Sequence, residues 1–161
     1  MSQQGFQDLV GSIVKAIGSK EVDEKLERLL NHQFPVEGLE FRKLAELCAV
    51  GEREGWLLQR SSGGIKFGRA IKPGGGAGRF SVDVVRMSNV VGPHHVHPAG
   101  EIGAVIPLSG APRFDGKVPG WYVYQAGSEH APTLSDGDAY VLYLLPEGAI
   151  EFTGREICRK S

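Results

Sequence analysis

The sequence is poor in cysteine, in charge of one sign and in long hydrophobic runs. Cys48 and Cys158 are its two cysteines, far apart and outside any C-x-x-C pair, which excludes a disulfide scaffold and indicates the reducing cytoplasm. With 18 basic and 19 acidic residues the net charge is −1, so neither nucleic acid nor an anionic membrane is an expected partner. The longest apolar runs, near 140–146, are far shorter than the roughly 20 residues of a membrane helix, and the N-terminus lacks the pattern of a signal peptide.

Glycine is the residue that the sequence has in excess. It accounts for 23 of 161 residues, which is about twice its average share of about 7%. Most of these glycines follow Gly51, in turn-like pairs such as Asp115-Gly116 and Asp136-Gly137. Such pairs are typical of short strands joined by tight turns. At 41% hydrophobic and 23% charged residues, the chain suits one globular domain with a buried core.

The first 54 residues have the apolar spacing of amphipathic helices. Between Phe6 and Ile17, apolar residues recur at steps of three and four, which places them on one helix face. Gly18 and Pro35 are residues at which helices commonly end. We expect helices over 6–17, 22–34 and 37–54.

From Gly55 the apolar period changes to two, which predicts strands. We expect them over 56–60, 64–72, 79–87, 94–97, 101–108, 121–125 and 139–145, with 149–152 as a candidate eighth. Short strands separated by turns in this way indicate an all-β sandwich or barrel. We therefore predict a mainly β protein, one compact unit in which residues 1–54 form a helical cap and residues 55–161 form a barrel.

Three of the five histidines fall within four residues, in the segment GPHHVHPAGEI. Because residues i and i+2 of a strand share a face, His95 and His97 project together and His94 projects the other way. A tight turn then lets Glu101 return on the next strand, and His130 follows a later turn. One histidine on a strand is usually structural, but two on one face with a carboxylate nearby favour a metal site. Zinc, iron, manganese, nickel and copper all accept such ligands.

The spacing H-x-H-x-x-x-E followed by G-x-x-H, which begins at His95 and ends at His130, is similar to the two metal motifs of the cupin superfamily. The resemblance implies a small double-stranded β-helix barrel that holds one metal inside. All four ligand positions match. Some surrounding positions depart from the pattern, since Asn89 replaces an expected glycine and Gln125 an expected proline. These changes affect turns rather than ligands.

A closer resemblance covers most of the chain. The segments GGIKFGRAIKPG, FSVDVVRM, GPHHVHPAGEI, RFDG, GWYVYQAGSEHAPT and VLYLLPEGAIEF are similar to the 4-hydroxylaminobenzoate lyases, small bacterial proteins of nitroaromatic degradation. The resemblance implies that 4-hydroxylaminobenzoate and water react to give 3,4-dihydroxybenzoate (protocatechuate) and ammonia. This reaction is redox-neutral, and the sequence has no dinucleotide-binding fingerprint or P-loop, so we expect neither a nicotinamide nor a flavin cofactor.

The implied reaction assigns roles to further residues. The metal would act as a Lewis acid on the hydroxylamino oxygen, and a general acid–base group would move the protons, with Glu101, Tyr124 and Tyr122 as candidates. Phe67, Trp121, Tyr122, Tyr124 and Tyr140 are candidates for an aromatic pocket, although aromatic residues in strands are more often core.

The carboxylate of the implied substrate calls for a cation. Arg69 is the first candidate because its charge interrupts an apolar strand face, and Arg86 on the next strand is the second. Lys72, at a strand end, is a weaker candidate. Each arginine is equally well explained as a side chain that reaches solvent from a strand end.

Other functions compete with the lyase interpretation. A cupin dioxygenase, or another lyase or isomerase of small aromatic acids, would suit the same ligands, and a dioxygenase would consume oxygen. A non-catalytic ligand-binding cupin would hold the metal only for structure. The expected partner is a small aromatic carboxylate. The resemblance to cupins, whose barrels often pair through sheet edges, also implies a homodimer with the apolar residues 139–145 in its interface.

Overall fold

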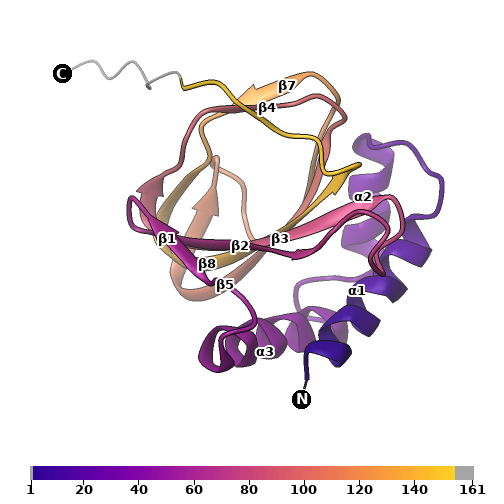
Figure 1. The fold of residues 1–161 in the computed structure, drawn as a ribbon, viewed down its shortest axis with the longest axis horizontal. Coiled ribbons are helices and arrows are strands. Elements are labelled where there is room, and N and C mark those ends of the chain that lie inside the picture. The colour runs from indigo at the N-terminus through magenta and orange to yellow at the C-terminus, as the bar shows by residue number, and fades with distance from the viewer. Residues whose placement is uncertain (1, 155–161) are drawn as a thin grey trace.

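The computed structural model describes residues 2–154 and places three helices beside a rolled antiparallel β-structure (Figure 1). The helices are α1 (Gln3–Ile17), α2 (Glu24–Gln33) and α3 (Leu39–Glu54). The side chains of Ser2 and Asp23 cap α1 and α2 by accepting a hydrogen bond from a backbone N–H three residues further on. Gly55, with a left-handed φ of 85°, follows the end of α3. The three helices predicted from the first 54 residues are therefore present, and none of them is long and apolar enough to cross a membrane.

Nine strands follow within the described chain, and neighbouring strands pair antiparallel. Their bounds are β1 (Arg60–Ser62), β2 (Ile65–Ile71), β3 (Phe80–Val91), β4 (His95–His97), β5 (Glu101–Phe114), β6 (Gly120–Tyr124), β7 (Ser128–His130), β8 (Thr133–Pro146) and β9 (Glu151–Phe152). A six-stranded sheet has the order β1-β2-β3-β8-β5-β6, and a three-stranded sheet has the order β7-β4-β9. In Figure 1, β4 and β7 lie across the barrel from α3.

The middle strands of the large sheet, β3, β8 and β5, are largely buried on both faces. On the outer face, alternate residues pack with the helices in one apolar cluster, whose sheet members include Val82, Val84, Ile102, Ala104, Leu142 and Leu144. On the inner face, the residues between them form a second cluster inside the barrel, which includes Met87, Val105, Phe114, Ala139 and Val141. Because both faces are apolar, the second half of β8 is an almost unbroken hydrophobic run rather than an alternating strand.

One strand prediction is wrong, and one short strand was not predicted. Residues 56–59 form no strand. Trp56 instead packs edge-on against Phe6, with ring centres 5.8 Å apart, and Leu57 and Leu58 are buried. The apolar pattern here reflects packing against the helices. The short strand β7 was not predicted, because a three-residue strand without apolar residues has no sequence pattern to reveal it.

The prediction that residues 139–145 lie at a subunit interface is also wrong. They belong to β8, which pairs with β3 along one side and with β5 along the other. Their apolar side chains are used by the two clusters within this one chain. A homodimer through another surface stays a prediction.

Candidate metal centre

Three imidazoles and one carboxylate meet inside the barrel, from three different strands. His95 and His97 lie on β4, His130 ends β7 and pairs directly with His95, and Glu101 begins β5. The chain turns into β5 at Gly100, whose φ of 91° favours glycine. One candidate ligand atom from each of the four residues lies within 4.8 Å of the others. The structure thus brings together all four ligands predicted from the sequence.

The three imidazoles point the same ring nitrogen at one another. The Nε2 atoms of His95 and His97 are 3.1 Å apart, those of His97 and His130 are 3.1 Å apart, and those of His130 and His95 are 3.0 Å apart. Oε1 of Glu101 lies 2.6 Å from Nε2 of His97. His95, His97 and Glu101 are buried, and His130 is nearly so.

The partners of the other ring nitrogens fix two of the tautomers. Nδ1 of His95 lies 3.0 Å from the carbonyl oxygen of Pro93, and Nδ1 of His130 lies 2.7 Å from Oδ2 of Asp115. Because both oxygens accept, both Nδ1 atoms carry the proton. Burial and then the neighbouring His97 and His130 lower the pKa of His95 to about 4, so this ring is neutral at pH 7. A neutral ring with a protonated Nδ1 presents a lone pair at Nε2.

This donor set fits a divalent metal ion. The Nε2 lone pairs of His95 and His130 face each other at 3.0 Å and cannot hydrogen-bond to each other. Ligand nitrogens about 2.0–2.1 Å from one shared ion lie about 3 Å apart when they are adjacent in its coordination shell. Nδ1 of His97 is buried and has no hydrogen-bond partner among the described residues, so its ring is held by packing and by Nε2. The cluster can therefore bind a transition metal.

Tyr122 is tied to the carboxylate of the cluster. Its hydroxyl donates a hydrogen bond to Oε2 of Glu101, the oxygen that does not face His97. Burial, and then the charge of Glu101, raise the pKa of Tyr122 well above its usual value, so the hydroxyl keeps its proton. The ring lies over Gly103, its partner on β5, where a Cβ atom would collide with the phenol. Glycine at this position is what makes room for Tyr122.

Asp115 and Tyr124 lie behind His130, outside the cluster. Oδ2 of Asp115 accepts the hydrogen bond from His130 and a second one, of 2.6 Å, from the Tyr124 hydroxyl. The backbone N–H of Thr133 donates to Oδ1 at 2.9 Å. Burial raises the pKa of Asp115, but these hydrogen bonds outweigh it and hold the pKa below its usual value. Sequence reasoning missed Asp115, because its only signal was the Asp-Gly pair that predicted a turn.

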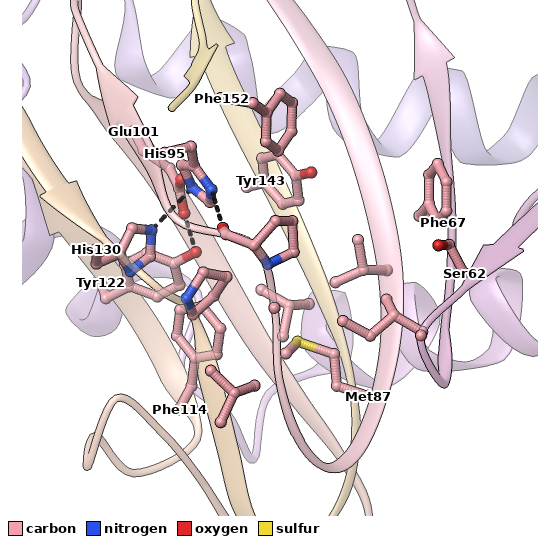
Figure 2. A pocket seen from close by; sticks show the side chains of 18 residues that line it. Ser62, Phe67, Met87, His95, Glu101, Phe114, Tyr122, His130, Tyr143 and Phe152 are labelled. Carbon is pink, nitrogen blue, oxygen red and sulfur yellow. Dashed lines mark hydrogen bonds between the residues drawn. The ribbon is translucent and has the colours of Figure 1, made fainter. Parts of the chain in front are cut away.

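A cavity of about 470 Å³ opens beside the cluster (Figure 2). His95, Glu101, Tyr122 and His130 form its polar end. The rest of the described wall is mostly apolar and includes Ile65, Phe67, Val85, Met87, Phe114, Pro132, Val141 and Phe152, with hydroxyls from Ser62 and Tyr143. This size and lining suit a small aromatic molecule.

None of the three predicted cations is among the described residues that line this cavity. Arg69 binds both oxygens of Asp83, at 3.1 and 3.2 Å. Arg86 binds Glu52 on α3 at 2.8 Å and is on the outer face, because the apolar stripe that it shares faces the helices rather than the cavity. Lys72 is exposed and, like both arginines, is not among the residues that line the cavity. Their placement gives no support to the predicted carboxylate contacts.

The predicted aromatic residues divide between the two faces. Phe67 and Tyr122 line the cavity, whereas Tyr124 lies behind His130. Trp121 and Tyr140 face the helices. The Trp121 indole donates to the carbonyl of Phe34 at 3.0 Å, and the Tyr140 hydroxyl donates to Glu52 at 2.6 Å. Tyr143 also lines the cavity but was not predicted to do so. Its two-residue spacing from Val141, another cavity residue, could have indicated this, because residues i and i+2 of a strand share a face.

Comparison with known proteins assigns the chain to a family. The family model for 4-hydroxylaminobenzoate lyase (PnbB) matches residues 8–152. A 4-hydroxylaminobenzoate lyase of Nocardioides sp. (strain LMS-CY) is 27% identical over 158 residues, covering 91% of this chain and 94% of the relative. A protein of the same name from Pseudomonas putida is 26% identical over 153 residues, covering 84% and 87%.

A solved structure of another protein shares the fold of this chain. The DMSP lyase DddQ of Ruegeria pomeroyi DSS-3 superposes with a TM-score of 0.51 at 16% identity, over 90% of this chain and 76% of that chain. An RmlC-like cupin of Ralstonia eutropha JMP134 has a TM-score of 0.42 at 15% identity, over 56% of this chain and 60% of that chain. The mainly β architecture with an N-terminal helical region is confirmed, and the DMSP lyase shares this fold. From the match over residues 8–152, the chain belongs to the 4-hydroxylaminobenzoate lyase family.

Proposed function

We propose that the protein is a metal-dependent lyase that converts 4-hydroxylaminobenzoate and water to 3,4-dihydroxybenzoate and ammonia. Its membership of the lyase family supports the reaction class. The observation that carries the metal dependence is the convergence of three Nε2 atoms and the Glu101 carboxylate at the polar end of the cavity. Zinc, iron and manganese all suit these ligands.

The reaction balances without an external oxidant or reductant. The N–O bond breaks and its oxygen leaves as water. One water adds to the ring carbon beside the nitrogen-bearing carbon, and a second water replaces the nitrogen, which leaves as ammonia. The net consumption is one water. A divalent metal bound by the cluster would supply Lewis-acid stabilisation of the departing oxygen.

The chain's own residues would position the substrate and move its protons. The apolar wall around Phe67 and Phe114 would hold the aromatic ring and exclude water. Glu101 and its hydrogen-bonded partner Tyr122 both line the cavity. We therefore assign the acid–base role to this pair, with the proton held on the Tyr122 hydroxyl beside the hydroxylamino group of the substrate. Tyr124 has no place in this step because it does not line the cavity.

We assign the substrate carboxylate to Tyr143. A buried carboxylate needs hydrogen-bond donors, and the hydroxyl of Tyr143 lies on the cavity wall without a hydrogen bond to any described residue. Burial, and then the charges of Asp83 and Glu101, raise the pKa of Tyr143, so its hydroxyl stays protonated and donates. Ser62, at the end of β1, offers a second hydroxyl from the same wall.

The test is an anaerobic assay of the purified protein, after its metal content has been measured. We expect 4-hydroxylaminobenzoate to give both 3,4-dihydroxybenzoate and ammonia without oxygen. Product formation only with oxygen would overturn the lyase assignment in favour of a dioxygenase. Neither product from fully metal-loaded protein would overturn the substrate.

A matched pair of histidine variants tests the metal site in the same assay. His95→Ala removes a ligand and should abolish both metal binding and turnover. His94→Ala is its control, because the neighbouring ring points away from the cluster and lies 2.7 Å from the Thr153 hydroxyl. Full activity of His95→Ala without bound metal would contradict the metal dependence.

A further inference from the structure

We propose that Asp115, held in place by Tyr124, is a positioning residue that fixes His130 for metal binding without touching the metal itself. The proposal rests on the metal site of the proposed function but not on its substrate. It also gives Tyr124 a role other than the acid–base role expected from the sequence.

The backbone of a tight turn places Asp115 beside His130, independently of the hydrogen bonds that the Asp115 side chain makes. Asp115 and Gly116 have φ values of 51° and 79°, and the two residues around them, Phe114 and Lys117, exchange backbone hydrogen bonds of 2.9 and 2.8 Å. This is the tight turn with two left-handed residues that Asp-Gly pairs favour. The N–H of Asp115 also donates to the carbonyl of Thr133 at 2.8 Å, which joins the turn to the chain three residues after His130.

The Asp115 side chain is held at both of its oxygens. Oδ2 accepts from Nδ1 of His130 at 2.7 Å and from the Tyr124 hydroxyl at 2.6 Å, and Oδ1 accepts from the Thr133 N–H at 2.9 Å. Three donors from different parts of the chain prevent the carboxylate from rotating. The orientation of the His130 ring, and the proton on its Nδ1, are therefore set by Asp115.

His130 needs this tether more than the other two histidines do. His95 and His97 are buried, whereas the side chain of His130 is 14% exposed. His95 donates to a neutral carbonyl, and Nδ1 of His97 has no partner among residues 2–154, so His130 is the ligand that is backed by a carboxylate. Such a carboxylate makes the imidazole a stronger ligand and fixes its tautomer.

Tyr124 acts on the metal centre through Asp115. Its ring packs edge-on against His130, with ring centres 4.8 Å apart, and its hydroxyl donates a hydrogen bond to Asp115. Tyr124 is not among the residues that line the cavity. The Lys117 ammonium lies 5.2 Å from the centre of the Tyr124 ring, a cation–π contact that joins the turn to this tyrosine. The turn at Asp115, the Asp115 carboxylate and Tyr124 together hold His130 in place.

The test compares the affinity of wild type and variants for zinc, measured by competition with a coloured chelator. Asp115→Asn keeps a residue that tolerates positive φ in the turn, but an amide has one acceptor oxygen in place of two. We expect zinc affinity to fall about 10- to 100-fold. Tyr124→Phe should lower it less, and the double variant should bind no more weakly than Asp115→Asn. Tyr140→Phe is the matched control, because it removes a phenol hydroxyl from a carboxylate on the outer face, and its affinity should be unchanged.

A second readout separates positioning from a loss of structure. In the zinc-loaded protein, NMR should show the Nδ1 proton of His130 exchanging slowly with solvent because Asp115 accepts it, and Asp115→Asn should speed this exchange without changing the rest of the spectrum. Wild-type zinc affinity in Asp115→Asn, or unchanged exchange of the His130 Nδ1 proton, would overturn the proposal. Neither measurement uses a substrate, so a failed lyase assay would leave it standing.

Discussion

Strand β8 contributes neighbouring residues to two surfaces with different purposes. Tyr140, Leu142 and Leu144 face the helices and belong to the larger apolar cluster. Val141 and Tyr143, which lie between them, face the barrel interior and line the cavity. The outer face is closed by packing, whereas the inner face keeps an open volume with ionisable ligands at one end.

The comparison predicts that the outer face mainly contributes stability and the inner face mainly contributes binding. On the outer face, charged groups such as Glu52 and Arg86 satisfy one another between helix and sheet. On the inner face, the Nε2 atoms of the three histidines converge on a shared point, and those of His95 and His130 cannot hydrogen-bond to each other, which is the arrangement of a binding site. Substitutions on the two faces should therefore differ in what they damage.

The largest difference is expected between Leu142→Ala and Val141→Ala. Leu142 is fully buried against the helices, so its truncation should lower the free energy of unfolding by about 2–5 kcal/mol. The folded fraction should keep its zinc affinity. Val141 borders an existing cavity, so Val141→Ala should cost less stability but raise KM for 4-hydroxylaminobenzoate. Urea unfolding and steady-state kinetics measure both quantities. Equal stability losses with equal KM values would contradict the division into faces.

Gly103→Ala should damage the inner face without emptying the core. The added methyl would occupy space now filled by the Tyr122 ring, so the phenol must move away from Glu101. We expect kcat to fall at least 10-fold, with a stability loss of about 1–3 kcal/mol from overpacking. Tyr122→Phe should lose a similar amount of kcat, and adding Gly103→Ala to it should reduce kcat little further. Independent, additive losses would show that Gly103 acts in some other way.

The helices, the strands and the metal ligands could be predicted from the sequence, but which face of each strand encloses the cavity could not. The short range of the histidine pattern, with two ligands on one strand and Glu101 just beyond a turn, made the metal site visible. The side of the sheet on which Arg86 lies could not be predicted from the sequence. A sheet that is buried on both sides has two apolar faces, and the apolar period does not indicate which of them encloses the cavity. Asp115 was also hidden, because its contact with His130 depends on how the turn packs against Thr133.

Tyr143→Phe tests the carboxylate assignment on the inner face. A hydrogen bond to a charged group is worth about 1.5–3 kcal/mol, so KM for 4-hydroxylaminobenzoate should rise about 10- to 100-fold while kcat changes little. Phenylhydroxylamine, which lacks the carboxylate, should be processed equally by variant and wild type. Tyr140→Phe, on the same strand but on its outer face, should leave KM unchanged for both 4-hydroxylaminobenzoate and phenylhydroxylamine. An equal effect of Tyr143→Phe on both substrates would place this hydroxyl at the reacting end instead.

The smallest effect is expected from a charge on the outer face, where Glu52 accepts hydrogen bonds from Tyr140, Arg86 and Lys66 at 2.6, 2.8 and 3.2 Å. Burial raises the pKa of Glu52, but these partners outweigh it and hold the pKa below its usual 4.5. A carboxylate with a lowered folded-state pKa stabilises the fold above its unfolded pKa, and this stabilisation is lost as pH falls through the folded value.

Glu52→Gln should therefore unfold more easily at pH 7 and lose less stability than wild type between pH 7 and pH values below about 4.5, the usual pKa of this carboxyl. Urea unfolding at several pH values measures this slope. The variant should keep wild-type zinc affinity at pH 7, because Glu52 packs on the helix side of the sheet and is not among the residues that line the cavity. A weakened metal site in Glu52→Gln would show that the two faces are coupled through the sheet, and the separation of stability from function would then be wrong.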